Sequence, residues 1–260
     1  MTKIEWAHQT LNPIAGCTQI SPECANCYAI NMARRLGAMG QEKYGGLVQG
    51  GTWTGRTSYD PTVMDKAKTW HKPSRIFLVS MGDLFHESVS DLARAEIIRK
   101  AAHYGQHSWL VLTKRPQTMA AFLGERCPKR LPNAWFGCSA GTQGTADRSR
   151  AAMADLAMLG FATWVSCEPM LGPVDFSGWE FIRWIVIGGE SGPGARPFHA
   201  EWAIPVMEWA KANGIAIFFK QMGKANFLGG NPLDHTSKGD DFESWPEAFW
   251  VRQFPRGMVQ

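Results

Sequence analysis

Charged residues make up only 19% of the 260-residue sequence, and no apolar run approaches the ~20 residues that a membrane-spanning helix needs. The first ten residues also lack the basic and then apolar pattern of a secretory signal peptide. Apolar residues make up 45% of the chain and include 12 Trp and 14 Phe, which excludes disorder for most of it. We therefore expect a cytoplasmic, globular protein with no membrane partner.

Several common site patterns are missing as well. The seven His show no metal-ligand spacing, and no Ser-His-Asp arrangement can be argued from residue order alone. The glycine-rich stretch GGESGPG at 188–194 lacks the Lys-Ser/Thr ending of a phosphate-binding loop. The net charge of +4 would help the chain to approach nucleic acid, but it is spread along the sequence and identifies no partner.

The apolar pattern predicts the fold class. Six short, nearly continuous apolar runs, typical of parallel strands buried on both faces, lie at 75–79, 108–112, 134–138, 162–166, 183–187 and 215–219. Helix-like stretches alternate with them at 90–104, 117–124, 145–159 and 200–213. With a first strand around 10–15 and a helix at 28–36, the sequence predicts a full or partial (β/α) TIM-like barrel over residues 1–223. A doubly wound open sheet is the alternative.

Two segments interrupt this alternation. The first, residues 37–74 after the first helix, is glycine-rich and is interpreted as a substrate lid, a nucleic-acid contact or a surface excursion without a role. Its candidates for stacking on a base or contacting DNA phosphates are Trp53, Arg56, Lys66, Lys68 and Trp70. The second, residues 224–260, is expected to pack as an extension over one end of the barrel.

The most informative pattern is a cluster of cysteines. Cys17, Cys24 and Cys27 form C-x6-C-x2-C between the first predicted strand and the first helix. Three thiolates on one loop can bind three irons of a [4Fe–4S] cluster and leave the fourth iron open. Zinc is the competing interpretation, but a structural zinc site needs four ligands and none beyond the three is evident nearby.

This arrangement resembles the radical S-adenosylmethionine (SAM) superfamily, although the superfamily motif is C-x3-C-x2-C and the first gap here has six residues. More specifically, the chain looks like a phage and prophage family of radical-SAM-like proteins. The motifs that carry this likeness are Ile4-Glu5-Trp6, Gly16-Cys17, Cys27-Tyr28-Ala29, Ser80-Met81-Gly82-Asp83, Leu112-Thr113-Lys114-Arg115-Pro116, Ser166-Cys167-Glu168-Pro169, Gly188-Gly189-Glu190-Ser191 and Phe219-Lys220-Gln221.

The resemblance implies a cluster and a SAM site at the carboxyl ends of the strands, where barrel enzymes place their active sites. Ser80 and Asp83 would meet the SAM ammonium, and Lys114 or Ser139 its carboxylate. Glu168 and the turn of Gly188, Gly189 and Glu190 would meet the ribose or the ammonium, and Tyr28 is a further cofactor-binding candidate. The candidate catalytic residues are Lys220, Cys167 and Glu168, although Cys167, like Cys138, also suits a core position.

The implied activity is an enzyme that forms a 5′-deoxyadenosyl radical from SAM and modifies or isomerises a hypermodified nucleobase in phage DNA. Flavodoxin or ferredoxin would supply the electron, in the cytoplasm of an infected or lysogenic bacterial host. Two alternatives stay open. One is a radical SAM enzyme that acts on a peptide or small metabolite, and the other is a non-catalytic, zinc-containing barrel that binds nucleic acid or a protein partner.

Overall fold

A computed structural model describes residues 4–127, 131–233, 236 and 238–260 and has an α/β fold. Seven parallel strands form its main sheet in the order β1-β6-β7-β8-β9-β10-β12. These strands are β1 (Gln9–Leu11), β6 (Arg75–Leu78), β7 (Ser108–Thr113), β8 (Ala134–Ser139), β9 (Ala162–Cys167), β10 (Trp184–Gly188) and β12 (Ala216–Gln221). The α-helices of the described residues are α1 (Tyr28–Ala38), α2 (Asp91–His103), α3 (Pro116–Arg126), α4 (Gln143–Met158) and α5 (Ala203–Ala212). None of these helices has the length and apolar composition needed to cross a bilayer.

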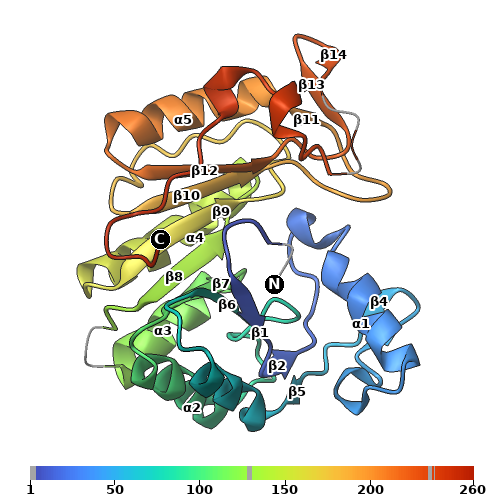
Figure 1. Cartoon of the computed structure of the whole chain (residues 1–260), viewed down its shortest axis with the longest axis vertical. Coiled ribbons are helices and arrows are strands. Elements are labelled where there is room, and N and C mark those ends of the chain that lie inside the picture. The colour runs from blue at the N-terminus through green and yellow to red at the C-terminus, as the bar shows by residue number, and fades with distance from the viewer. Residues whose placement is uncertain (1–3, 128–130, 234–235, 237) are drawn as a thin grey trace.

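The sheet curls into a half-barrel, with α2, α3, α4 and α5 outside it and α1 across from its concave side (Figure 1). In the described part of the chain, β1 and β12 are the two edges of the sheet and do not pair with each other. The expected (β/α) barrel is therefore confirmed in its partial form.

Aromatic side chains fill the concave face near the amino ends of the strands. Because successive side chains of a strand point to opposite faces, Trp135, Trp164 and Trp184 lie in one inner cluster with Trp6. Gly137 makes room for this packing, since a Cβ there would lie only 2.4 Å from the Trp164 indole. This half of the interior is packed core, so a pocket on the concave side must lie near the carboxyl ends of the strands.

The first predicted strand, around residues 10–15, is divided in two. The break falls at Asn12-Pro13, because proline has no N–H to continue a strand ladder. Ile14–Ala15 then forms a separate strand, β2, which pairs antiparallel with β5 (Ser58–Tyr59) of the insertion. The insertion also contains the hairpin of β3 (Val48–Gln49) and β4 (Thr52–Trp53), followed by the 3-10 helix η3 (Pro61–Thr69).

Two further differences concern the last third of the chain. Residues 168–183, between β9 and β10, contain no α-helix, so the expected alternation is interrupted there. The extension follows the outer edge of β12, where the Phe219 N–H donates to the Val251 carbonyl at 2.7 Å and the Gln253 N–H to the Ile217 carbonyl at 2.7 Å. Earlier in the extension, β13 (Asn226–Leu228) joins β11 (Phe198–His199) and β14 (Asn231–Pro232) in a small sheet.

Candidate functional site

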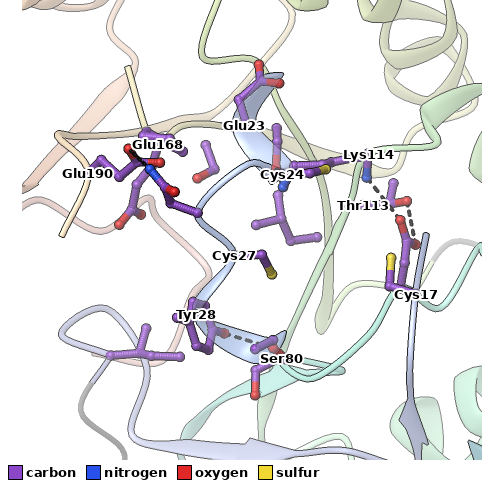
Figure 2. Close-up of a pocket in the computed structure, with 18 of the residues that line it drawn as sticks. Cys17, Glu23, Cys24, Cys27, Tyr28, Ser80, Thr113, Lys114, Glu168 and Glu190 are labelled. Carbon is purple, nitrogen blue, oxygen red and sulfur yellow. Dashed lines mark hydrogen bonds between the residues drawn. The ribbon is translucent and has the colours of Figure 1, made fainter. Parts of the chain in front are cut away.

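A pocket of about 230 Å³ opens at the carboxyl ends of the strands, beside the cysteine loop (Figure 2). It brings together these predicted site residues: Cys17, Cys24, Cys27, Tyr28, Trp53, Ser80, Asp83, Lys114, Ser139, Glu168, Gly189, Glu190 and Lys220. Its volume lies below the 300–1,000 Å³ typical of small-molecule sites. A large ligand would therefore require the rim to move outward.

A close contact between two glycines fixes the start of the cysteine loop. Gly16 has φ +96°, which favours glycine, and its N–H donates to the Met81 carbonyl at 3.0 Å. A Cβ on Gly82 would lie 2.7 Å from the Gly16 carbonyl oxygen. The loop is thus held directly against the end of β6, with Cys17 at the edge of the pocket.

Glu190 and Arg196 hold the other end of the loop. The Glu190 carboxylate accepts hydrogen bonds from Asn26 Nδ2 at 2.8 Å and from Arg196 Nε at 2.9 Å. Arg196 Nη1 donates to the Pro22 carbonyl at 2.8 Å. The Glu190 carboxylate therefore contacts Asn26 of the cysteine loop and Arg196, whereas the sequence suggested a contact with the SAM ribose or ammonium. Arg196 and Asn26 were not among the predicted site residues.

Glu23, between two of the cysteines, is a further residue that sequence reasoning missed. It is only 5% exposed, and its Oε1 accepts from the Gly141 N–H at 3.0 Å and from Thr145 Oγ1 at 2.6 Å. Burial alone would raise the pKa of Glu23, but hydrogen bonds from Ser21, Thr145 and the backbone hold it below its usual value. Because Gly141 and Thr145 lie at the start of α4, Glu23 ties the loop to the amino end of that helix.

The lowered pKa values of Glu23 and Glu190 make the stability of the protein depend on pH. Burial alone would raise the pKa of Glu190 too, but the hydrogen bonds from Arg196 and Asn26 hold it below 4.5, the value it would have unfolded. A lowered folded pKa contributes stability that is present above the unfolded pKa and is lost as the pH falls through the folded value. We expect the free energy of unfolding to decrease below about pH 4.5.

Urea unfolding measured across this acidic range tests that expectation. Glu23→Gln and Glu190→Gln should each reduce the acid dependence, and Glu208→Gln, at an exposed position, should not. An unchanged pH profile in both site variants would contradict the prediction.

Asp83 and Arg115 form a buried ion pair behind Cys17. Asp83 accepts from Thr113 Oγ1 at 2.6 Å and from Arg115 Nη1 at 3.1 Å, and also from the backbone N–H groups of Phe85 and Lys114. Its oxygens are thus engaged within the protein, whereas the sequence suggested that Asp83 meets the SAM ammonium. Burial, together with the Asp83 charge, raises the pKa of the Cys17 thiol to about 11, and the Arg115 charge opposes this rise.

Three polar pairs line the rest of the pocket. Lys220 of β12 donates to Oε1 of Glu168, which follows β9, over the end of the intervening strand β10. Lys114 Nζ donates to Ser139 Oγ at 3.3 Å. Tyr28 Oη donates to the Ser80 carbonyl at 2.8 Å (Figure 2). The pocket wall therefore offers ammonium, carboxylate and hydroxyl groups from separate strands, which suits a ligand that carries both a carboxylate and an ammonium group.

Two of the predicted site residues, Cys167 and Gly188, do not line the pocket. Cys167 is fully buried in the core between the sheet and the helices, because its neighbours Ser166 and Glu168 face the pocket and alternation turns Cys167 outward. Gly188, at the end of β10, is not among the residues that line the pocket.

Of the five candidate nucleic-acid contacts, only Trp53 lines the pocket. Trp70 packs against the core between the sheet and the helices. Its ring lies edge-on to His107, with the two ring centroids 6.2 Å apart. Lys66 and Lys68 are exposed on η3, which packs beside α2, and Arg56 is exposed on the insertion.

The three cysteine thiols suit some metal groups better than others. In the described residues, no group of three His, Cys, Asp or Glu side chains converges where a single metal ion would bind. A [4Fe–4S] cluster imposes a looser condition, since each cysteine binds its own iron. Three thiols of one loop that line one pocket fit a cluster with three protein ligands better than they fit a single zinc ion.

A protein family described as "Protein of unknown function (DUF5131)" matches residues 1–246. The chain belongs to this family. No curated protein and no solved structure matches the chain. The matched range of the DUF5131 family includes the cysteine loop and every residue that lines the pocket. Because the family description names no activity, the function is argued below from the pocket itself.

Gly189 is a sensitive position in this DUF5131 pocket. An alanine Cβ there would lie 2.0 Å from the Met222 carbonyl oxygen, so the chain after β12 would have to move. We expect Gly189→Ala to lower the free energy of unfolding by about 3 kcal/mol, measured by urea denaturation. Gly172→Ala is the matched control, because a Cβ there meets nothing within 4 Å and its effect should be small. Equal stability of the two variants would contradict the close approach.

Proposed function

We propose that the protein is a radical SAM enzyme that binds a [4Fe–4S] cluster through Cys17, Cys24 and Cys27. The observation that carries this proposal is that these three thiols line one pocket together with polar side chains from six strand ends. The bound cofactors would supply electron transfer and a 5′-deoxyadenosyl radical, and the protein would bind, orient and shield the reactants.

The pocket residues have separate roles in this proposal. Lys114 with Ser139 would bind the SAM carboxylate, and the Glu168 carboxylate its ammonium, with Lys220 holding Glu168 in place. Glu23 and Glu190 would keep the loop in its geometry through the contacts described above. The Trp cluster fills the interior at the amino ends of the strands, so no water-filled space continues below the pocket there.

Iron and sulfide analysis of anaerobically reconstituted protein, with an absorbance spectrum, tests the cluster. We expect about four irons per chain and absorbance near 400 nm, as for a [4Fe–4S] protein. The variant in which Cys17, Cys24 and Cys27 are all alanine should lose both. The matched control replaces the three other cysteines, Cys127, Cys138 and Cys167, and should retain them. Stoichiometric zinc in place of iron would overturn the proposal in favour of a non-catalytic metal-binding barrel.

For the substrate we propose a nucleobase of DNA. The support is Trp53, which lines the pocket and belongs to the same glycine-rich insertion as the exposed Arg56. A base within a duplex would have to be flipped out to reach this pocket, and an aromatic ring at the entrance would stack on it.

Duplex binding at several salt concentrations tests this substrate. The logarithm of the binding constant should fall linearly with the logarithm of salt concentration, and Arg56→Ala should reduce the slope by about 1. Lys68→Ala is the comparison, because Lys68 is paired with Asp65 at 3.4 Å on the η3 segment away from the pocket. A binding constant that does not respond to salt would exclude DNA. A peptide or small metabolite would then be tested by 5′-deoxyadenosine formation.

A further inference from the structure

Arg115 contacts one of the three clustered cysteines directly. Its Nη1 donates to the Cys17 sulfur at 3.8 Å and to Asp83 Oδ2 at 3.1 Å, while its Nε donates to Glu87 Oε2 at 2.9 Å. Arg115 is only 8% exposed. A planar guanidinium can meet these three acceptors at once, because its N–H groups project in fixed directions.

The contact distinguishes Cys17 from its neighbour in the loop. The Cys24 sulfur lies 3.4 Å from Ser21 Oγ, a neutral partner. Arg115 instead brings a positive charge to the sulfur of Cys17, in a site largely closed to solvent. In such surroundings a charged hydrogen bond is stronger than it is in water.

One terminal nitrogen of Arg115, which carries two N–H bonds, has no acceptor in the described part of the chain. Nη2 is buried, and no hydrogen-bond partner for it lies within the described residues. Leaving a buried donor of a cation unsatisfied costs stability. The sulfur atoms of a cluster bound to Cys17 are acceptors of the kind that would relieve this cost.

We propose that Arg115 is a positioning residue that donates a hydrogen bond to the Cys17 sulfur and thereby raises the reduction potential of the cluster. The inference rests on the proposed function, since it needs a cluster at the three cysteines. Reduction by an external one-electron donor adds one negative charge to the cluster. A cation and an N–H donor beside one ligand sulfur stabilise the reduced form more than the oxidised form.

The first test is potentiometric titration of the loaded protein, followed by electron paramagnetic resonance of the reduced cluster. Arg115→Gln should lower the equilibrium constant for reduction about tenfold, the size of one charged hydrogen bond, which corresponds to about 60 mV. The matched control, Arg148→Gln, removes the same charge from an exposed position, where solvent screens it, and should change the potential little. An unchanged potential in Arg115→Gln would overturn the inference.

A double variant separates the hydrogen bond from net charge. Arg115→Gln leaves Asp83 unpaired, whereas Asp83→Asn with Arg115→Gln removes one charge of each sign and leaves no unpaired buried carboxylate at this position. We expect the double variant to fold and still to have a potential below that of the wild type. A return to the wild-type potential would mean that net charge alone set it, which would overturn the proposed contact.

A second measurement detects the hydrogen bond itself. In protein grown with arginine labelled with ¹⁵N in the guanidinium group, the reduced cluster should show a ¹⁵N coupling in pulsed electron paramagnetic resonance. The Arg115→Lys protein, which keeps the charge but loses the guanidinium, should lack it. If the wild-type protein binds no iron, the proposed function fails. If it binds iron but shows no ¹⁵N coupling, only the role of Arg115 fails.

Discussion

Replacing any one of Cys17, Cys24 and Cys27 with alanine is expected to reduce 5′-deoxyadenosine formation to the background rate. A cluster with three protein ligands and one open iron has no spare ligand, so each cysteine is required. The three single variants should therefore have the same effect, measured by chromatography of SAM incubated with dithionite and protein.

The control for this experiment is Cys127→Ala. Cys127 is half-buried at the end of α3 and does not line the pocket, so the variant should retain iron and activity. If one of the three loop variants kept its activity, that cysteine would not be a ligand. If all three kept it, no cluster at this loop would take part in the reaction.

Lys220→Met is expected to weaken SAM binding about 100-fold while the iron content stays unchanged. The variant removes the ion pair that holds the Glu168 carboxylate in place, so the carboxylate no longer faces the SAM ammonium in a fixed geometry. A misplaced contact of this kind can cost about 100-fold. Methionine keeps the length and apolar character of the lysine stem, so packing against β12 changes little. Equilibrium dialysis with labelled SAM on the cluster-loaded protein measures the effect.

Lys224→Met provides the comparison, because Lys224 is an exposed lysine four residues further along the chain. It should bind SAM as the wild type does. Unchanged SAM binding in Lys220→Met would show that the pair with Glu168 lies outside the cofactor site. A loss of iron in Lys220→Met would instead assign the pair to the support of the cysteine loop.

The location of the site could be predicted because strand ends are visible in the sequence. Ser80, Ser139, Glu168 and Lys220 each follow an apolar run, and parallel strands place such residues at one edge of the sheet. Cys167 was grouped with them because it is adjacent in sequence, but the period of two along β9 turns it toward the helices. When every residue of a strand is apolar, the sequence does not show which residues face the pocket and which face the helices, because both faces of the strand are buried.

The partners of the charged residues could not be predicted. Asp83 and Glu190 were expected to meet a cofactor, but their recorded contacts are Arg115, Arg196 and other groups of the protein. Glu190 and Asn26 are 164 positions apart in the sequence. Pairings over such distances depend on how the loop packs, because no local pattern in the chain specifies them.

The sequence by itself determined the α/β class, the parallel strands and the cysteine loop beside the first helix, because periodicity and spacing are local properties. Only the tertiary structure decided that the sheet stops at half a barrel, that Pro13 divides the first strand, and that Glu23 and Arg115 support the cysteines. These outcomes depend on packing and on hydrogen-bond partners distant in the chain, since a buried charge is stable only where the fold supplies its partner.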